Sequence, residues 1–204
     1  MRGKFITLEG IDGAGKSTHL RRTARFLRRR GIKVKVTREP GGTAVGEALR
    51  RLVLGSKRGL NPETEALLMF AARREHLHKV IVPALAAGRW VLCDRFTDAT
   101  YAYQSAGSGV SWRKIALLER WTQAGLQPDL TILFDVSPKI GRGRASRRKN
   151  PDRFEREKGE YYRRVRNAYL RRARENPRRI KVIDSNRSLA EVDRQLQKRL
   201  LSFC

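Results

Sequence analysis

A phosphate-binding loop near the start of the chain constrains the fold more than any other feature. Residues 10–18 read GIDGAGKST and match the pattern G-x-x-x-x-G-K-[ST], and they follow the apolar run FITL at residues 5–8. Glycines allow successive backbone N–H groups to turn toward a polyphosphate, and a helix beginning at Lys16 directs the positive end of its dipole at the same anion. The sequence therefore predicts a strand, a loop that binds a nucleoside triphosphate, and a helix.

This loop supplies the candidate nucleotide-binding residues. The Lys16 ammonium is expected to hold the β- and γ-phosphates, and the Ser17 hydroxyl to bind Mg²⁺. Glu9, at the end of the preceding strand, either helps to hold water around the metal or accepts hydrogen bonds from loop N–H groups. ATP and Mg²⁺ are the expected cofactors. The residues assigned to the nucleotide are Gly10, Ile11, Asp12, Gly13, Ala14, Gly15, Lys16, Ser17 and Thr18.

Apolar runs alternate with helix-like stretches along the chain, a pattern typical of an α/β fold whose parallel strands are joined by crossover helices. The predicted strands cover residues 5–9, 34–37, 90–94, 130–135 and 180–183. Helices are predicted from Lys16 to just before Gly31, and over residues 112–124 and 189–201. Because ligands of such sheets bind beyond the carboxyl ends of the strands, the charged residues at those ends are the candidate site.

Composition sets further bounds. The 204 residues fit one domain, residues 1–204, and neither of the two cysteines has metal-ligand spacing, which favours a reducing, cytoplasmic setting. No run of eighteen apolar residues predicts a membrane span. The net charge of +26 predicts nonspecific binding to polyanions. Nucleic acid is not expected as a functional partner, because no segment suggests a dedicated groove.

Four further segments resemble thymidylate kinases. They are TREPGGT at residues 37–43, FAARR at 70–74, CDRF at 93–96 together with TYAYQ at 100–104, and the arginine-rich stretch 142–155. With the phosphate-binding loop, they extend the resemblance from one end of the chain to the other. The first and third segments are far more specific than the loop, which many unrelated nucleotide-binding enzymes share.

This resemblance implies a three-layer nucleoside-monophosphate kinase fold of the P-loop type, with a five-stranded parallel sheet flanked by helices. Residues around 142–155 would form a lid. The implied reaction is phosphorylation of dTMP to dTDP by ATP with Mg²⁺, a step of dTTP biosynthesis, carried out by a homodimer. The alternatives are another nucleoside-monophosphate kinase, or a P-loop ATPase stimulated by nucleic acid.

Transfer of a phosphoryl group between two polyanions depends mostly on positioning and on cationic stabilisation. Arg38 and Arg95, each just past a predicted strand, suit bidentate binding of the acceptor phosphate, and Arg50 is a weaker third candidate. Asp94, at a strand end, is placed to hold Mg²⁺ directly or through water. In the similar family, the position of Asp12 meets the 3′-hydroxyl of the acceptor.

For the base, Phe70 and Arg74 are four residues apart in a helical stretch and share one face. An aromatic ring could stack on a pyrimidine while the arginine contacts a carbonyl. Met69 and Arg73 form an equally spaced alternative, displaced by one residue. The choice of Phe70 with Arg74 rests on the similar family, which has an aromatic residue there.

A second group of polar residues is expected opposite that helix. Thr100 and Gln104, again four residues apart, offer hydrogen-bonding groups to the edge of the base. Tyr103 is a candidate to crowd a ribose 2′-hydroxyl. Together with Arg38, Phe70, Arg74 and Arg95, these three residues are the expected substrate-binding set.

One departure within the family concerns Gly13. Some thymidylate kinases, including those of animals and fungi, have an arginine there, and similar enzymes that lack it have arginines in the lid. Arg148 and Arg153 are our first choices for that role, with Arg144 and Arg147 as neighbours. The expected catalytic residues are Asp12, Lys16, Arg95, Arg148 and Arg153.

Overall fold

A computed structural model describes residues 2–56, 59–145, 154, 157 and 159–203. Its centre is a parallel sheet of five strands in the order β2-β3-β1-β4-β5. This confirms the predicted fold class, and the predicted strands agree with the observed ones to within one residue at each end. The strands are β1 (Phe5–Glu9), β2 (Val34–Arg38), β3 (Trp90–Asp94), β4 (Leu130–Asp135) and β5 (Ile180–Asp184).

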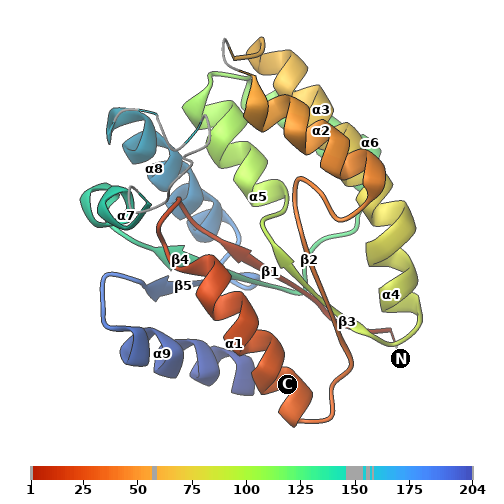
Figure 1. Cartoon of the computed structure of the whole chain (residues 1–204), viewed down its shortest axis with the longest axis vertical. Helices are drawn as coiled ribbons and strands as arrows, with labels where there is room; N and C mark the ends of the chain where they lie inside the picture. Colours follow the sequence, from red (N-terminus) through yellow and green to blue (C-terminus); the bar gives the residue numbers. More distant parts are fainter. Residues whose placement is uncertain (1, 57–58, 146–153, 155–156, 158, 204) are drawn as a thin grey trace.

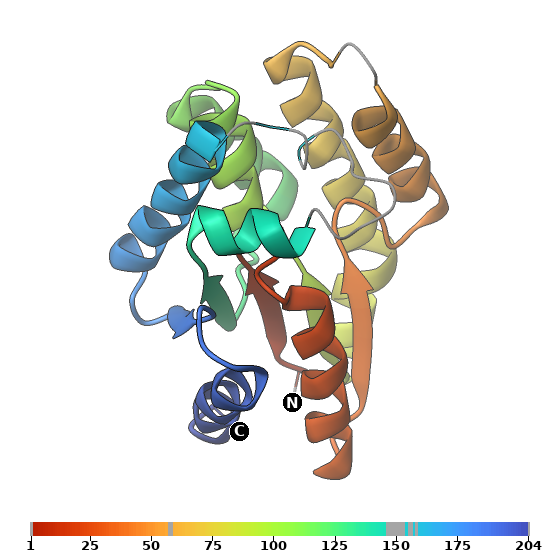
Figure 2. The same cartoon turned by 60° about the vertical axis from the view of Figure 1, so that its left-hand side comes forward.

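Helices connect the strands and cover both faces of the sheet (Figure 1). They are α1 (Lys16–Arg29), α2 (Ala44–Gly55), α3 (Pro62–His76), α4 (Val82–Ala86), α5 (Thr97–Thr100), α6 (Trp112–Gln123), α7 (Pro138–Ala145), α8 (Gly159–Glu175) and α9 (Leu189–Leu201). Two π-helical turns continue α3 and α5: η1 (Leu77–Ile81) and η2 (Tyr101–Gly107). In Figures 1 and 2, α1 and α9 lie together at one end of the molecule, and α8 lies away from them beside α7.

Alternation of side chains along the buried strands explains the layers. Phe5 of β1 joins an apolar cluster with Leu77 and Ile81 of η1, whereas the next residue, Ile6, belongs to the cluster that includes Leu27 of α1. Successive strand residues point to opposite faces, so one face packs against α1 and the other against η1 and α4. Because both faces are covered, β1 is completely buried.

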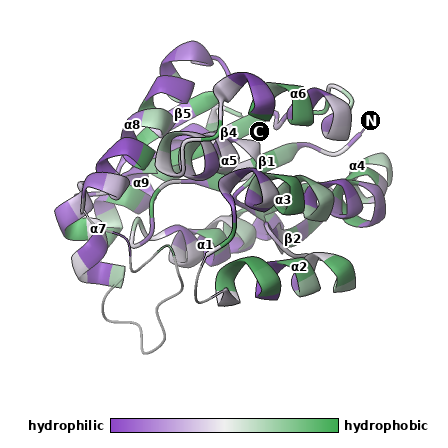
Figure 3. Ribbon diagram, turned by 90° about the horizontal axis from the view of Figure 1, so that it is seen from above, coloured by the Kyte–Doolittle hydropathy of each residue, from purple (hydrophilic) through white to green (hydrophobic). Residues whose placement is uncertain are grey.

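The outer surfaces of the helices are polar. Hydrophilic residues are prominent along α8 in Figure 3, in keeping with its many arginines. Among the described residues, the helices include none with the length and apolar character required to span a membrane.

The strand ends gather charged side chains at one edge of the sheet. β1 ends at Glu9, β2 at Arg38 and β3 at Asp94, and the register pairs Arg38 with Asp94 across β2 and β3. These ends meet the loop that precedes α1 and the start of α5. This edge is where ligands of parallel sheets bind.

Candidate active site

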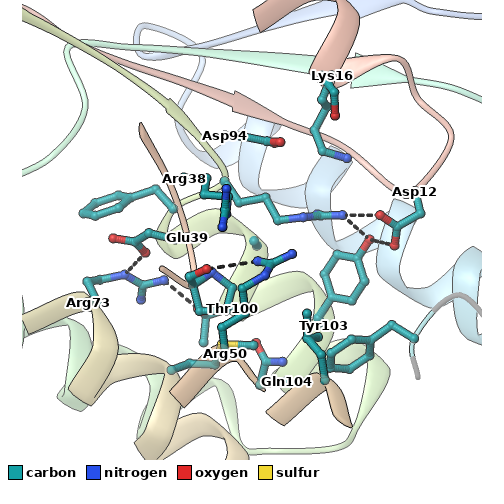
Figure 4. Close-up of a pocket in the computed structure, with 18 residues that line it drawn as sticks. Asp12, Lys16, Arg38, Glu39, Arg50, Arg73, Asp94, Thr100, Tyr103 and Gln104 are labelled. Atoms are coloured by element: carbon teal, nitrogen blue, oxygen red, sulfur yellow. Dashed lines mark hydrogen bonds and ion pairs between the residues drawn. The ribbon is translucent and has the colours of Figure 1, made fainter. Parts of the chain in front are cut away.

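A cavity of about 310 Å³ opens at the carboxyl ends of the strands, a volume typical of small-molecule sites (Figure 4). Its lining comes from segments far apart in the chain. The phosphate-binding loop and β3 supply one side, and α2, α3, α5 and η2 supply the other. The lining residues are Asp12, Lys16, Ser17, Arg38, Glu39, Pro40, Arg50, Leu54, Met69, Arg73, Asp94, Arg95, Phe96, Ala99, Thr100, Tyr103, Gln104 and Phe154.

The phosphate-binding loop folds as the motif predicts, with positive backbone φ angles at Gly10, Gly13 and Gly15 and helix α1 beginning at Lys16. The buried Lys16 ammonium donates to the carbonyl oxygens of Gly10 and Ile11, at 2.9 and 3.0 Å. Burial, together with the nearby charge of Arg95, lowers the pKa of Lys16 to about 8. A polyphosphate in the loop would favour the charged form.

Asp12, Arg95 and Tyr103 form a hydrogen-bonded group on one wall of the cavity (Figure 4). Arg95 Nη2 donates to Asp12 Oδ1 at 2.6 Å and to the Tyr103 hydroxyl at 3.0 Å. The Tyr103 hydroxyl donates in turn to Asp12 Oδ2 at 2.9 Å. Burial raises the pKa of Tyr103, which keeps this hydroxyl protonated and able to donate. Three residues predicted for acceptor binding or catalysis therefore lie in direct contact.

Two buried groups behind Arg95 hold its side chain. Arg95 Nη1 donates to the carbonyl oxygen of Gly10 and to the Tyr169 hydroxyl, at 3.0 and 3.1 Å. That hydroxyl is 2.9 Å from Oε2 of Glu9, whose Oε1 accepts the backbone N–H of Phe96 at 2.6 Å. Burial, and next the negative charge of Asp98, raise the pKa of Glu9 to about 8. Glu9 thus accepts a backbone N–H bond, one of the two roles considered for it, and its role toward water around the metal stays a prediction.

Asp94 and Ser17 fit a divalent cation. Both line the cavity, and Asp94 Oδ1 is buried with no hydrogen-bond partner among the described residues. A buried carboxylate oxygen in that state is costly without a ligand. Carboxylate and hydroxyl oxygens are ligands that Mg²⁺ accepts beside the phosphates of a substrate.

Arg38 and Arg50 approach the cavity from the segment that follows β2. Arg38 Nη2 donates to both carboxylate oxygens of Glu47, each at 2.9 Å, and Glu47 also accepts the backbone N–H of Gly42. Arg50 Nη1 donates to the carbonyl oxygen of Pro40 at 3.0 Å. Glu47 therefore directs the Arg38 guanidinium. Because the Arg38 side chain is half exposed, the guanidinium is still accessible to a ligand.

Helix α3 presents Met69 and Arg73 to the cavity, not Phe70 and Arg74. Phe70 is buried in the apolar cluster between α3, η2 and α6, and Arg74 Nη1 donates to the carbonyl oxygen of Thr122 on α6. A shift of one residue turns a helix by about 100°, and the packing of Phe70 against α6 fixes which turn is adopted. The two residues of α3 that line the cavity are therefore each one position earlier in the chain than the predicted pair, Phe70 and Arg74.

A buried network that the sequence did not suggest holds Arg73 in place. Arg73 Nε donates to Glu39 Oε2 at 2.7 Å, and His76 Nδ1 lies 2.9 Å from Glu39 Oε1. The Thr37 hydroxyl lies 2.7 Å from the other ring nitrogen of His76. Burial tends to raise the pKa of Glu39, but Arg73 and His76 outweigh it and hold this pKa below its usual value. Glu39 is therefore a buried carboxylate whose charge is balanced by Arg73.

The two terminal nitrogens of Arg73 differ in their hydrogen bonding. Its Nη2 donates to the Thr100 hydroxyl at 3.0 Å, whereas its buried Nη1 has no hydrogen-bond partner in the described part of the chain. Gln104 lies four residues beyond Thr100, and its Nε2 donates to the buried carboxylate of Glu65 at 2.8 Å. Figure 4 shows Arg73, Thr100 and Gln104 around the same part of the cavity. Thr100 and Gln104 therefore both line the cavity, and their contact with a base stays a prediction.

Two features of the sequence could have pointed to these carboxylates. Glu65, Met69 and Arg73 follow one another at intervals of four and so share a helical face, and a carboxylate on a face that also carries Met69 is unusual. Glu39 lies inside the TREPGGT segment, which had already been singled out.

The predicted lid lies mostly outside the described residues, and Arg147, Arg148 and Arg153 are among those left out. Arg144 is described: its Nη1 donates to the carbonyl oxygen of Ser185 at 2.9 Å, and it is not part of the cavity lining. Phe154 does line the cavity and contacts the Tyr103 ring edge to face, with 5.5 Å between ring centroids.

The chain is similar to known proteins over nearly its whole length. Residues 8–196 match the family model described as thymidylate kinase. The chain is 60% identical to the thymidylate kinase of Nitrosospira multiformis over 203 residues, covering 100% of this chain and 99% of that protein. It is 61% identical to the thymidylate kinase of Nitrosomonas europaea over 94% of this chain and 89% of that protein. The crystal structure of thymidylate kinase from Ehrlichia chaffeensis superposes with a TM-score of 0.79 at 35% identity, covering 98% of this chain and 99% of that one.

Proposed function

Because the chain belongs to the thymidylate kinase family and phosphorylates dTMP to dTDP with ATP as donor, we propose that dTMP binds in the cavity described above. One observation carries this proposal. The same cavity holds the cationic end of the phosphate-binding loop and, away from it, the buried polar side chains of Arg73, Thr100 and Gln104, with Arg73 Nη1 lacking a hydrogen-bond partner among the described residues. A nucleoside monophosphate has a charged end and a polar, planar end.

The phosphate groups are assigned to the strand-end side of the cavity. We assign Lys16 and the loop backbone to ATP, and Arg38 and Arg95 to the acceptor phosphate, because guanidinium groups bind phosphate oxygens in pairs. Asp94 and Ser17 would hold Mg²⁺, which when bound neutralises charge on the reacting phosphates. Asp12 is assigned to the 3′-hydroxyl, and the hydrogen bond between Tyr103 and Asp12 supports the assignment of the Tyr103 ring to the space beside the sugar.

The base is assigned to the opposite side. Arg73 replaces Arg74 in this proposal because its unpartnered Nη1 is available to a pyrimidine carbonyl, and Met69 replaces Phe70 as the apolar surface beside the base. Thr100 and Gln104 contact the edge of the base.

The transferring phosphoryl group needs cations that Gly13 does not provide. We retain Arg148 and Arg153 for this role, since α7 leads directly into their segment and packs against the loop at Gly13. Such cations act most strongly where water is excluded.

The enzyme is proposed to be cytoplasmic and a homodimer. The dimer is supported by an exposed apolar surface on α6, where Trp121 and Leu117 are one helical turn apart and 76% and 58% exposed. Leu67, on the neighbouring helix α3, is 53% exposed. Apolar patches of this kind mark association sites in proteins that are otherwise polar at the surface.

The test of the acceptor site compares Arg73→Lys with Arg74→Lys. Lysine at 73 keeps a positive charge beside Glu39, but its single ammonium group cannot donate to Glu39, Thr100 and a ligand at the same time. The KM for dTMP should therefore rise about tenfold to a hundredfold, the effect of one charged hydrogen bond. Lysine at 74 should leave the KM nearly unchanged. Steady-state kinetics with ATP and dTMP measure both. The reverse result would return the base to Phe70 and Arg74.

A further inference from the structure

Glu65 is a carboxylate buried behind the cavity, only 1% exposed and outside its lining. Its Oε1 accepts a hydrogen bond of 2.8 Å from Nε2 of Gln104, which is also 1% exposed. Glu65 comes from α3 and Gln104 from η2, so the contact joins two elements that line the same side of the cavity. Neither the phosphate chemistry nor the assignment of base contacts gives Glu65 a role.

The contact fixes which way the Gln104 amide faces. The hydrogen bond runs from Nε2 of Gln104 to the carboxylate, so the NH₂ group of Gln104 faces Glu65. The carbonyl oxygen of the amide then lies on the other side of the same planar group. Within the described part of the chain, that oxygen accepts no hydrogen bond, and Gln104 lines the cavity. Gln104 therefore offers the cavity an acceptor.

Arg73 brings a donor to the same part of the cavity (Figure 4). Its guanidinium can only donate, Nε is committed to Glu39, and Nη2 is committed to Thr100, four residues before Gln104. The remaining Nη1 is buried and has no partner among the described residues. Two buried carboxylates thus each hold a polar side chain of this part of the cavity: Glu39 holds Arg73, and Glu65 holds Gln104.

Pyrimidines differ at the two positions that such a pair would contact. Thymine has a carbonyl acceptor at position 4 and an N–H donor at position 3, whereas cytosine has an amino donor at position 4 and a bare nitrogen acceptor at position 3. A donor beside an acceptor complements thymine. Cytosine would bring its amino group against the guanidinium and its ring nitrogen against the Gln104 carbonyl.

We propose that Glu65 is the residue that makes this enzyme select thymine over cytosine, by holding the Gln104 amide with its carbonyl oxygen toward N3–H of the base. Glu65 is a positioning residue, because it acts through Gln104. This inference rests on the proposed acceptor site. Without the carboxylate, the amide could turn over and present its NH₂ group to the bare nitrogen of cytosine.

The experiment uses Glu65→Gln, which keeps the shape of the side chain and replaces the acceptor-only carboxylate by a group that can also donate. The NH₂ group of the new side chain at position 65 can donate to the Gln104 carbonyl oxygen. The Gln104 amide can then form a hydrogen bond with position 65 in either orientation. We expect the ratio of kcat/KM for dTMP to that for dCMP to fall at least tenfold, mainly through a lower KM for dCMP. Glu63→Gln is the matched control, because Glu63 lies on the same helix with its carboxylate exposed and paired with Lys114; its ratio should not change.

Glu65→Asp separates orientation from packing. Aspartate keeps a carboxylate but lacks one methylene group and so leaves a small space. If Glu65 only fills space, Glu65→Asp should therefore lose more of the preference for dTMP than the isosteric Glu65→Gln. The proposal predicts the opposite order for selectivity: Asp retains more of the preference for dTMP than Gln does. An unchanged ratio in folded Glu65→Gln, or a greater loss of selectivity in Glu65→Asp, would overturn it.

Two outcomes concern the wild-type enzyme. If it used dCMP as well as dTMP, the proposed acceptor site would fail before Glu65 was tested. If Glu65→Gln does not fold, wild type is assayed with dTMP methylated at N3, which lacks the N–H donor. A KM for this analogue more than tenfold above that for dTMP supports the proposal, and an equal KM contradicts it.

Discussion

Arg95 illustrates how single residues of this site are held before any substrate arrives. Its backbone φ is +69°, in the left-handed region that residues other than glycine rarely adopt, at a cost of about 1–3 kcal/mol. Its guanidinium contacts Asp12, Tyr103, Tyr169 and the carbonyl oxygen of Gly10. These contacts offset the strained backbone. A cation fixed in this way loses little conformational freedom when a phosphate binds, which is an advantage for electrostatic catalysis.

Glu9 gives a prediction of pH-dependent stability at the same scale. Its pKa is raised to about 8 in the folded protein, against 4.5 when unfolded, so between these values the unfolded chain binds fewer protons than the folded one. The contribution of Glu9 to stability must therefore fall as pH rises from about 4.5 to about 8. Glu9→Gln keeps the shape and removes the titration.

We expect the Tm of Glu9→Gln minus that of wild type to increase by several degrees between pH 5 and pH 8, since about 1 kcal/mol corresponds to roughly 2–4 °C in a chain of this size. Thermal melts followed by circular dichroism at several pH values measure it. Glu191→Gln is the control, because Glu191 is exposed on α9 and accepts hydrogen bonds at the helix start. If the plots of Tm against pH for wild type and Glu9→Gln run parallel, Glu9 is ionised in the folded state.

At the scale of elements, the phosphate-binding loop and α7 approach so closely that only glycine fits. A Cβ at Gly13 would lie 1.9 Å from the carbonyl oxygen of Gly141, and a Cβ at Gly141 would lie 2.9 Å from that of Asp12. This contact provides a physical reason for Gly13 beyond the family comparison. Any side chain at this position, arginine included, requires α7 to move.

Gly141→Ala tests whether this contact matters for turnover. The added methyl group lies closest to backbone, 2.9 Å from the Asp12 carbonyl oxygen, and also meets the side chains of Ile11 and Val136 at 3.1 and 3.3 Å. Because the backbone contact cannot be relieved by a side-chain rotation, α7 and the loop must separate, at a cost of about 1–3 kcal/mol. We expect kcat to fall about tenfold or more, because Asp12 and the start of the lid are displaced together. Gly143→Ala is the control on the same helix, where an added Cβ meets nothing within 4 Å. Equal kinetics for the two variants would mean that the loop tolerates the shift.

The elements were predictable from the sequence because each has a strong local signal. Buried parallel strands read as short apolar runs, and the loop motif requires the strand before it and the helix after it. The face of α3 was not predictable in this way. Residues 69–74, MFAARR, offer two pairs at the same spacing, and the packing of Phe70 against α6 decides between them. That packing is a tertiary contact, absent from the local pattern.

The same distinction applies within the site. Asp12, Arg95 and Asp94 could be predicted because each directly follows a strand or lies in the loop. Glu39 and Glu65 were missed: the TREPGGT segment and the spacing to Met69 and Arg73 drew attention to their positions, but their burial depends on partners 34 and 39 residues away in the chain.

At the scale of the whole molecule, the net charge of +26 opposes association of two copies. The proposed dimer surface on α6 must overcome this repulsion through apolar contact. Salt screens charges over about 8–10 Å at 0.10–0.15 M and leaves apolar contact intact. The dimer should therefore become tighter as salt is added, the opposite of an association that depends on ion pairs.

Trp121→Ala removes the largest exposed apolar side chain of that surface. A tryptophan at the centre of an interface commonly contributes about 2 kcal/mol or more, so the dimer dissociation constant should rise roughly thirtyfold. Leu189→Ala is the control, because Leu189 is 47% exposed on α9, at the other side of the fold (Figure 1). Sedimentation equilibrium at 0.05 and 0.5 M NaCl measures both effects. A wild-type protein that is monomeric at both concentrations would rule out the dimer. A Trp121→Ala dimer as tight as wild type would move the interface away from α6.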